Sequence, residues 1–234
     1  MTLWLRVRAP FAAFRWLQAG VYRATSPVIP PSAAWGLLLN LAHVETRSGE
    51  DRATTAIRAD APSLRIAVGA VGEAGVSSIY QQLHSYLVGS SSGTDLKKRV
   101  YGGKYWISPV RRELLVGFDA VLGVQSPDRS LEDRMLAGLR GELDVERYGL
   151  PFAGDNNLLI DRIEAVDEPP AASWYEAMAH DSPPRAGSCR LTVAIDRRDS
   201  AQTTTRLYAP TMPSTKPPEA AWTWVPRAPK EDAA

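Results

Sequence analysis

The chain has 234 residues, of which 44% are hydrophobic, so it can bury the core of one large domain or two small ones. Its single cysteine, Cys189, excludes a disulfide framework and any zinc or iron–sulfur site built from several cysteines, and it fits a reducing cytosol; we expect a cytoplasmic protein with no metal and no cofactor. The net charge of +1 does not by itself indicate a polyanionic partner.

The first residues show no membrane-targeting pattern. Residues 1–11 alternate polar and apolar side chains from the third position, so we expect neither a signal peptide nor a membrane anchor. The longest apolar region, residues 33–44, is interrupted by Gly36, Asn40 and His43 and is too short to span a bilayer. We therefore expect no membrane partner.

The first two elements are expected to be a strand and a helix. Leu3, Leu5 and Val7 alternate with other side chains, which is the period of a half-buried strand. After an irregular stretch, the prolines at positions 30 and 31 suit the first turn of a helix. Apolar residues from Ala34 to Val44 then share one helical face.

Four further elements follow a predicted mobile loop at residues 45–61. Alternating apolar residues predict the second strand at 64–68 and the third at 114–122. Ser130 and Asp133 have the spacing of a capping box, which predicts the start of a second helix. Its apolar stripe comprises Leu131, Met135, Leu136, Leu139 and Leu143. The fourth strand is predicted within residues 158–166.

The order strand, helix, strand, strand, helix, strand predicts an α+β fold with a ferredoxin-like (RRM-like) βαββαβ body, an arrangement used by RNA-recognition domains and by many unrelated proteins. Residues 189–195 and 203–207 flank a polar turn and should form a hairpin, with a last strand at 222–225. The predicted divisions are a body at 1–71 and 114–168, a β-hairpin insertion at 72–113, a strand-rich C-terminal extension at 169–225 and a disordered tail at 226–234.

The charges are segregated along the chain. Residues 1–44 carry four arginines and no acid, and residues 97–112 carry six cations and no acid, whereas residues 142–181 carry ten acids and two arginines. Such segregation lets a nearly neutral protein present a basic face to phosphates and an acidic face to another protein. Charge alone leaves open that these blocks are ordinary solvated surface.

The insertion at 72–113 is the most informative segment, because a connection of this length inside a compact domain is usually functional. It contains a flexible glycine- and serine-rich tip at 89–93 and returns through a basic, aromatic run at 97–106. The cations can contact phosphates while the rings stack on bases, each stack contributing about 1–3 kcal/mol. The alternative is a solvated hairpin whose aromatic residues pack on the body.

Several segments occur in an order typical of one known family. They are the opening strand Leu3 to Ala9 with Phe11 and Phe14, Thr25-Ser26 leading to Pro30-Pro31-Ser32-Ala33 and Gly36-Leu37-Leu38, the long insertion, and Gly149-Leu150-Pro151-Phe152 with Gly154-Asp155-Asn156-Asn157. In this order they resemble the Cas-five subunits of type I CRISPR Cascade, within the repeat-associated RNA-binding superfamily. The resemblance covers most of residues 1–168, and the C-terminal third matches only in being short and strand-rich.

The resemblance implies a ferredoxin-like body with a β-hairpin thumb, here residues 72–113. It implies a subunit that caps the 5′ handle of the crRNA. The implied partners are the crRNA, the Cascade backbone subunit, the large subunit, and target DNA reached through the assembled complex.

The residues expected to contact RNA combine this resemblance with the local pattern. Arg6 and Arg8 would share one strand face with Trp4, and the start of the first helix offers free backbone donors beside Arg23, which suits a phosphate. Trp35 is expected to be buried in helix–sheet packing instead. The predicted RNA-binding set is Trp4, Arg6, Arg8, Arg23, Ser32, Gly36, Lys97, Lys98, Arg99, Tyr101, Lys104, Tyr105 and Trp106.

One branch of the family cleaves precursor crRNA without metal, through tyrosine, lysine and histidine. Such cleavage needs a base near the 2′-hydroxyl and an acid or cation at the leaving oxygen. His43 is expected at a helix end and His180 in an acidic loop, and only His84 lies in the basic insertion, apart from Lys104. We therefore predict a non-catalytic binder; the alternative is a metal-independent endoribonuclease that uses Tyr80, His84 and Lys104.

Other chemistry finds little support in the sequence. There is no glycine-rich phosphate loop, no GxSxG motif and no histidine or cysteine spacing typical of a metal site. Asp155, Asp161 and Glu164 have no neighbouring histidine and are expected to be turn-forming and exposed. A third possible class is an adaptor that binds only other proteins and has a basic hairpin. Salt-dependent binding to a repeat-derived RNA would distinguish an RNA-binding subunit from such an adaptor.

Overall fold

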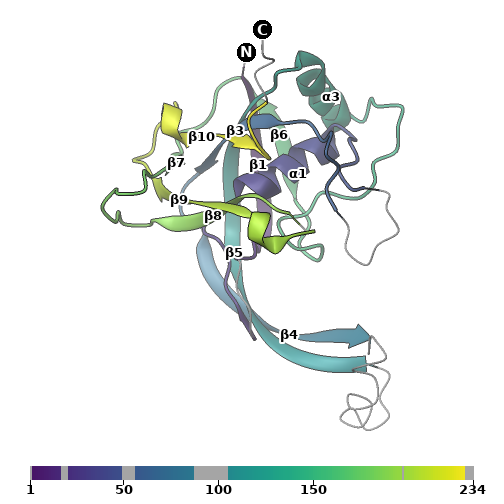
Figure 1. Cartoon of the computed structure of the whole chain (residues 1–234), viewed down its shortest axis with the longest axis vertical. Helices are drawn as coiled ribbons and strands as arrows, with labels where there is room; N and C mark the ends of the chain where they lie inside the picture. The colour runs from purple at the N-terminus through teal and green to yellow at the C-terminus, as the bar shows by residue number, and fades with distance from the viewer. Residues whose placement is uncertain (1, 17–20, 49–55, 87–104, 197, 230–234) are drawn as a thin grey trace.

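The structure, a computed structural model, describes residues 2–16, 21–48, 56–86, 105–196 and 198–229 (Figure 1). Its strands are β1 (Leu3–Ala12), β2 (Tyr22–Arg23), β3 (Leu64–Ala70), β4 (Gly75–Tyr86), β5 (Tyr105–Gln125), β6 (Arg162–Val166), β7 (Ser173–Ala177), β8 (Cys189–Ala194), β9 (Thr204–Pro210) and β10 (Trp222–Val225). The helices are α1 (Pro31–Leu41) and α3 (Arg129–Arg140), with 3-10 turns at Ser200–Gln202 and Glu219–Ala221.

The strands form one mainly antiparallel sheet in the order β6-β1-β5-β3-β7-β9-β8. β10 also pairs with β3, and β2 and β4 pair with β5. All six predicted body elements are present as β1, α1, β3, β5, α3 and β6. The α+β class is therefore confirmed for the described part of the chain.

β1 is a strand with two different faces, as its alternation predicted. Leu5, Val7 and Ala9 are buried in the main hydrophobic core, which also contains side chains of α1 and α3. Arg6 and Arg8, on the opposite face, remain partly exposed. The main core therefore lies on the helix-covered face of the sheet, and the predicted arginines lie on the other face.

α1 begins at Pro31, and its N-cap residue makes no side-chain capping hydrogen bond. Trp35 is buried, and its Nε1 donates to the carbonyl of Pro62 at 2.8 Å, which confirms the predicted packing role. The helix ends at Leu41 rather than near Val44, because His43 adopts a left-handed backbone conformation (φ 52°).

α3 begins earlier than predicted. Asp128 is its N-cap, and this carboxylate accepts from the backbone N–H of Ser130 at 2.9 Å, so the predicted capping box is wrong. Glu132 accepts from the N–H of Ser126 instead. The helix ends before Gly141 (φ 72°), which leaves Leu143 beyond it.

The predicted insertion is a two-stranded antiparallel hairpin that projects from the body (Figure 1). Its pairing runs from Gly75 opposite Val116 to Tyr86 opposite Tyr105. The returning strand of the hairpin and the predicted third body strand are one continuous 21-residue strand, β5. The predicted boundary between residues 113 and 114 therefore falls inside a strand.

The C-terminal strands extend the same sheet. β8 and β9 form the predicted hairpin, and β10 occurs where the last strand was predicted. The sequence did not predict β7, which pairs with both β3 and β9 and so joins this region to the body. Of the tail predicted to be disordered, residues 230–234 lie outside the described part of the chain.

The loop predicted at residues 45–61 is described only at its two ends. The described ends of the loop pair with each other: Arg47 bridges Ile57, and the N–H of Ser48 donates to the carbonyl of Ala56 at 2.8 Å. The part between these ends, residues 49–55, lies outside the described residues.

Within the described ranges, no helix is long and apolar enough to cross a membrane.

Candidate nucleic-acid interface

Arg6 lies on the face of the sheet opposite the helices, and its guanidinium is already bound by a carboxylate. Its Nε and NH2 donate to the two oxygens of Asp119 at 2.9 and 2.6 Å. The side chains are 31% and 19% exposed, respectively. Hydrogen bonding to Asp119 is the largest effect that raises the pKa of Arg6. Both side chains are therefore charged, and the pair has no net charge.

Arg8 is paired differently. Its NH2 donates to Glu164 at 2.6 Å, and the other oxygen of Glu164 forms an ion pair with Arg162, 3.0 Å from its Nε. Two cations therefore share one carboxylate and leave one net positive charge on this face. Glu164 lies on β6 and is partly buried, so the expectation that it is turn-forming and exposed is wrong.

Trp4 belongs to a second, smaller hydrophobic cluster on the same face as Arg6. Its ring lies 5.8 Å from that of Trp174 and 6.0 Å from that of Trp222. A Cβ at Gly123 would lie 2.5 Å from the Trp4 ring, so a glycine is needed beneath it. The structure thus gives Trp4 a packing role, while its predicted contact with RNA stays a prediction.

The connection from β1 to α1 is held against β5 by Glu113. This carboxylate accepts from the backbone N–H of Thr25 at 3.0 Å and from the hydroxyl of Tyr22. Thr25 in turn accepts from the N–H of Phe14 at 2.9 Å, which explains why the Thr25-Ser26 motif is buried. Arg23, on β2, forms no ion pair with any other described residue and remains available for a phosphate.

The start of α1 offers fewer backbone donors than the sequence suggested. Pro30 and Pro31 have no N–H, and the N–H groups of Ala33 and Ala34 both donate to the carbonyl of Pro30. Only the N–H of Ser32 is left in this first turn, so the expectation of several free donors is wrong.

Gly36 faces open space, because a Cβ at this position would meet no atom within 4 Å. Glycine in a helix interior costs about 0.5–1 kcal/mol relative to alanine. Packing within the described chain therefore does not explain this glycine, and its contact with RNA stays a prediction.

Most predicted thumb contacts fall beyond what the structure describes. Lys97, Lys98, Arg99, Tyr101 and Lys104 lie outside the described residues. For Tyr105 and Trp106 only the backbone is described; it pairs with Tyr86 and Ser85. These predictions stay untested.

The alternative catalytic set is only partly described. Tyr80 is exposed on β4, and His84 lies four residues further along the same strand, with its backbone opposite Ile107. Lys104 lies outside the described residues. The structure therefore leaves the predicted absence of catalysis untested.

The other histidines occupy the kinds of places predicted for them. His43 follows α1, where its Nε2 accepts from the Nε of Arg147 at 3.3 Å and its Nδ1 bonds the carbonyl of Val145. His180 is exposed beside Asp181. Among the residues that the structure describes, no group of three or more histidine, cysteine or acidic side chains could hold a metal.

Sequence reasoning missed an ion pair at the base of the thumb. Arg112 of β5 binds Asp155, and the two side chains are only 9% and 14% exposed. Asp155 also accepts from the N–H of Asn157 at 2.9 Å, so it does form a turn, but the expectation that it is exposed is wrong. A buried pair of this kind is costly to break, and it joins the loop after α3 to β5.

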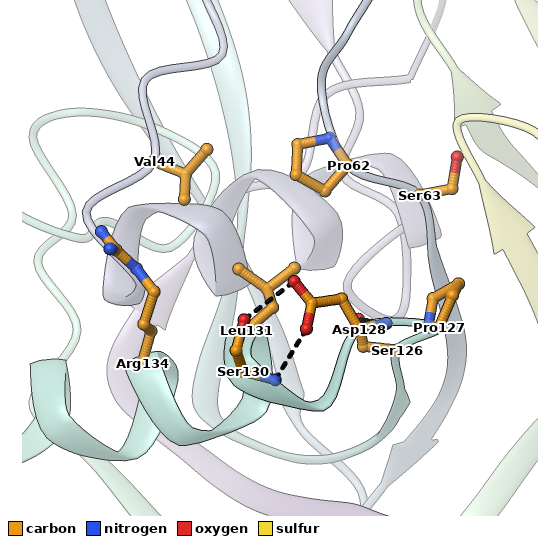
Figure 2. Close-up of a pocket in the computed structure, with 9 residues that line it drawn as sticks. All are labelled: Val44, Pro62, Ser63, Ser126, Pro127, Asp128, Ser130, Leu131 and Arg134. Carbon is orange, nitrogen blue, oxygen red and sulfur yellow. Dashed lines mark hydrogen bonds between the residues drawn. The ribbon is translucent and has the colours of Figure 1, made fainter.

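A pocket of ≈ 480 Å³ lies beside the first turns of α3, between Val44, which follows α1, and the residues Pro62 and Ser63 that precede β3 (Figure 2). Its polar side chains have structural roles: Asp128 caps α3, and Arg134 donates to the carbonyl of Ala42 at 3.0 Å. None of the predicted RNA-binding residues lines it. The pocket and the candidate interface are therefore separate features.

One solved structure has a similar fold over most of the chain. A solved structure described as "CRISPR RNA-guided surveillance complex" matches with a TM-score of 0.57 at 14% sequence identity, over 94% of this chain and 96% of that one. Another, "Crystal structure of Cas protein", matches with a TM-score of 0.49 at 12% identity, over 92% and 96%. No curated protein matches the sequence.

A family model gives the more specific result. The model described as "CRISPR-associated protein (Cas_Cas5)" matches residues 2–133, which is more than half of the chain. The matched region contains β1, α1, the thumb strands and the start of α3. The chain belongs to the CRISPR-associated Cas5 family.

Proposed function

We propose that this protein is a non-catalytic, crRNA-binding subunit of a type I CRISPR Cascade effector complex, in which it caps the 5′ handle of the crRNA. The observation that carries the proposal is the extent of the family match. Residues 2–133 include every residue predicted to contact RNA, from Trp4 to Trp106.

The sheet supports a ferredoxin-like body. Its central strands follow the order β6-β1-β5-β3, and the pairs β1–β6, β1–β5 and β3–β5 are all antiparallel. In such a body the first and third strands of the repeat lie side by side at the centre, with the fourth and second at the edges. A nucleic acid can then be read on the sheet face that the helices leave open.

The partners in the proposal are the backbone subunit, the large subunit and, through the assembled complex, target DNA, all in the cytoplasm. The similar solved structure bears the description "CRISPR RNA-guided surveillance complex", which supports a multi-subunit setting. The acidic segment 142–181 contrasts with the basic segments 1–44 and 97–112. This contrast supports separate surfaces for protein and for RNA.

Binding of the purified full chain to a repeat-derived RNA tests the proposal. We expect affinity for the handle sequence to exceed affinity for a scrambled RNA of equal length, and to fall as salt is raised, because phosphate contacts release counterions. Sequencing the RNA that co-purifies from the native host identifies the handle. Equal affinity for both RNAs, or co-purified RNA without repeat sequence, would contradict handle capping.

A further inference from the structure

Three side chains form a row across the base of the thumb. Arg111 of β5 is paired in register with Tyr22 of β2 on one side and with Tyr80 of β4 on the other. Residues directly opposite one another in a sheet point to the same face. With strands about 4.8 Å apart, the Cα atoms of the two tyrosines are about 10 Å apart, with the arginine between them.

The row is open to solvent. Tyr22 is 46% exposed, Tyr80 is 73% exposed, and Arg111 is also exposed. Tyrosine rings placed so openly on a strand contribute little to the core. Their exposure therefore points to an external partner that covers them.

The row is also held in place. The hydroxyl of Tyr22 donates to Glu113, and the Nε of Arg111 donates to the hydroxyl of Ser78 at 3.1 Å. The bond to Glu113 is the main cause that raises the pKa of Tyr22, and the charge of Arg111 opposes this shift. The terminal nitrogens of Arg111 have no hydrogen-bond partner among the described residues.

We infer that the Tyr22–Arg111–Tyr80 row is a stacking platform for an unpaired RNA base. This inference rests on the proposed function and names a subsite within it. Flat rings and guanidinium planes are the groups on which splayed RNA bases stack, and a cation between two rings can hold the adjoining phosphate. Tyr80 and Arg111 belong to β4 and β5, the strands that flank the basic segment 97–104 in the sequence, which favours RNA over a protein partner.

The test uses the full chain and a repeat-derived RNA in which 2-aminopurine replaces one nucleotide at a time. The fluorescence of 2-aminopurine falls when it stacks on an aromatic ring, so the scan locates a base that lies on the platform. We expect quenching beyond that of the free RNA at one or two adjacent positions.

Tyr80→Leu and Tyr80→Phe form the decisive pair. The leucine variant removes the ring from an exposed position, so the quenching should disappear and affinity should fall about tenfold. The phenylalanine variant keeps the ring and should keep the quenching. Arg111→Gln should weaken binding and reduce its salt dependence, without moving the quenched position.

Tyr148→Leu is the matched control. Tyr148 is also a partly exposed tyrosine beside an arginine, with the Arg47 guanidinium 5.1 Å from its ring centre, but it lies outside the thumb. This variant should retain the affinity and quenching of the wild type. Circular dichroism of each variant shows whether the fold is kept.

The outcomes separate the inference from the proposed function. If the wild type binds the RNA but Tyr80→Leu shows the same affinity and quenching, the platform is wrong and RNA binding stands. If Tyr80→Leu instead loses only its assembly with other Cascade subunits, the row is a protein contact and the inference is overturned. If the wild type does not bind the repeat-derived RNA, both the proposed function and the platform fail.

Discussion

At the scale of single residues, arginines with the same predicted role have different surroundings. Arg6 binds Asp119 with two hydrogen bonds, and Arg8 shares Glu164 with Arg162. Arg23 has no ion-pair partner among the described residues. A guanidinium that is already paired must give up or share its carboxylate before it can bind a phosphate, so these arginines should not contribute equally to RNA binding.

Salt dependence distinguishes these arginines. Arg23→Ala should reduce the slope of log affinity against log salt by about 0.7, the value for one phosphate contact with a single strand. Arg6→Ala should change the slope little but lower the free energy of unfolding by about 1 kcal/mol, because Asp119 loses its partner while partly buried. Titrations at several salt concentrations and urea unfolding measure the two effects. Equal slope changes with unaltered stability would show that Arg6 is a phosphate contact.

At the scale of elements, β5 connects the body to the thumb. One half of this 21-residue strand pairs with β1 and β3 in the body, and the other half pairs with β4. A strand shared in this way fixes the direction of the hairpin relative to the sheet. β5 begins at Tyr105, directly after the basic segment 97–104 in the sequence.

Charge reversal of the thumb tests its role. Replacing Lys97, Lys98, Arg99 and Lys104 with Glu should strongly weaken RNA binding and complex assembly, because four cations become anions near phosphates. These polar positions should contribute little to the core, so circular dichroism should remain native. The matched control replaces Arg190, Arg206, Lys216 and Arg227, four exposed cations of the C-terminal region, with Glu for the same change in net charge. If both variants lose RNA equally, the effect is one of net charge and not of the thumb.

At the scale of the whole molecule, the surroundings of the histidines and of the single cysteine bear on the prediction that the protein is non-catalytic. His43 is engaged at a helix end, and His180 is exposed in an acidic loop. Burial raises the pKa of the single thiol, Cys189, to about 12, so this thiol stays protonated at neutral pH. Of the three histidines, this leaves His84 as the candidate for the base that a metal-free ribonuclease would need, since histidine is the side chain that ordinarily changes charge near neutral pH.

We predict that the protein does not cut RNA. Labelled precursor crRNA mixed with the purified protein in EDTA should remain intact while a gel shift shows binding. A metal-free ribonuclease needs a base and an acid or cation together at the scissile bond, and no Lys-His pair occurs in the sequence.

A discrete product with a 2′,3′-cyclic phosphate would refute this prediction. Its loss in His84→Ala or Lys104→Ala would then assign the protein to the catalytic branch. Tyr80→Phe separates the two roles of that residue, because it removes a catalytic hydroxyl but keeps a stacking ring.

The sequence alone determined the main elements and the family. Burial of every second side chain from Leu5 to Ala9 of β1, and of one face of α3, is a local property that periodicity predicted. β3 and α1 were also predicted from their apolar spacing, but the sheet and its neighbours bury them on more than one face: residues 66–69 are all buried, as are residues 37–41. The helix boundaries were less accurate, because the cap at Asp128 and the left-handed His43 depend on single backbone conformations.

Only the tertiary structure decided which side chains meet. Arg6 and Asp119 are 113 residues apart, and the row of Tyr22, Arg111 and Tyr80 draws on three separate strands. β2 has two residues and therefore no periodicity to detect. Strand register is a non-local property that depends on the packing of the whole sheet, so no local pattern could show that two tyrosines flank an arginine or that Arg6 already has a carboxylate partner.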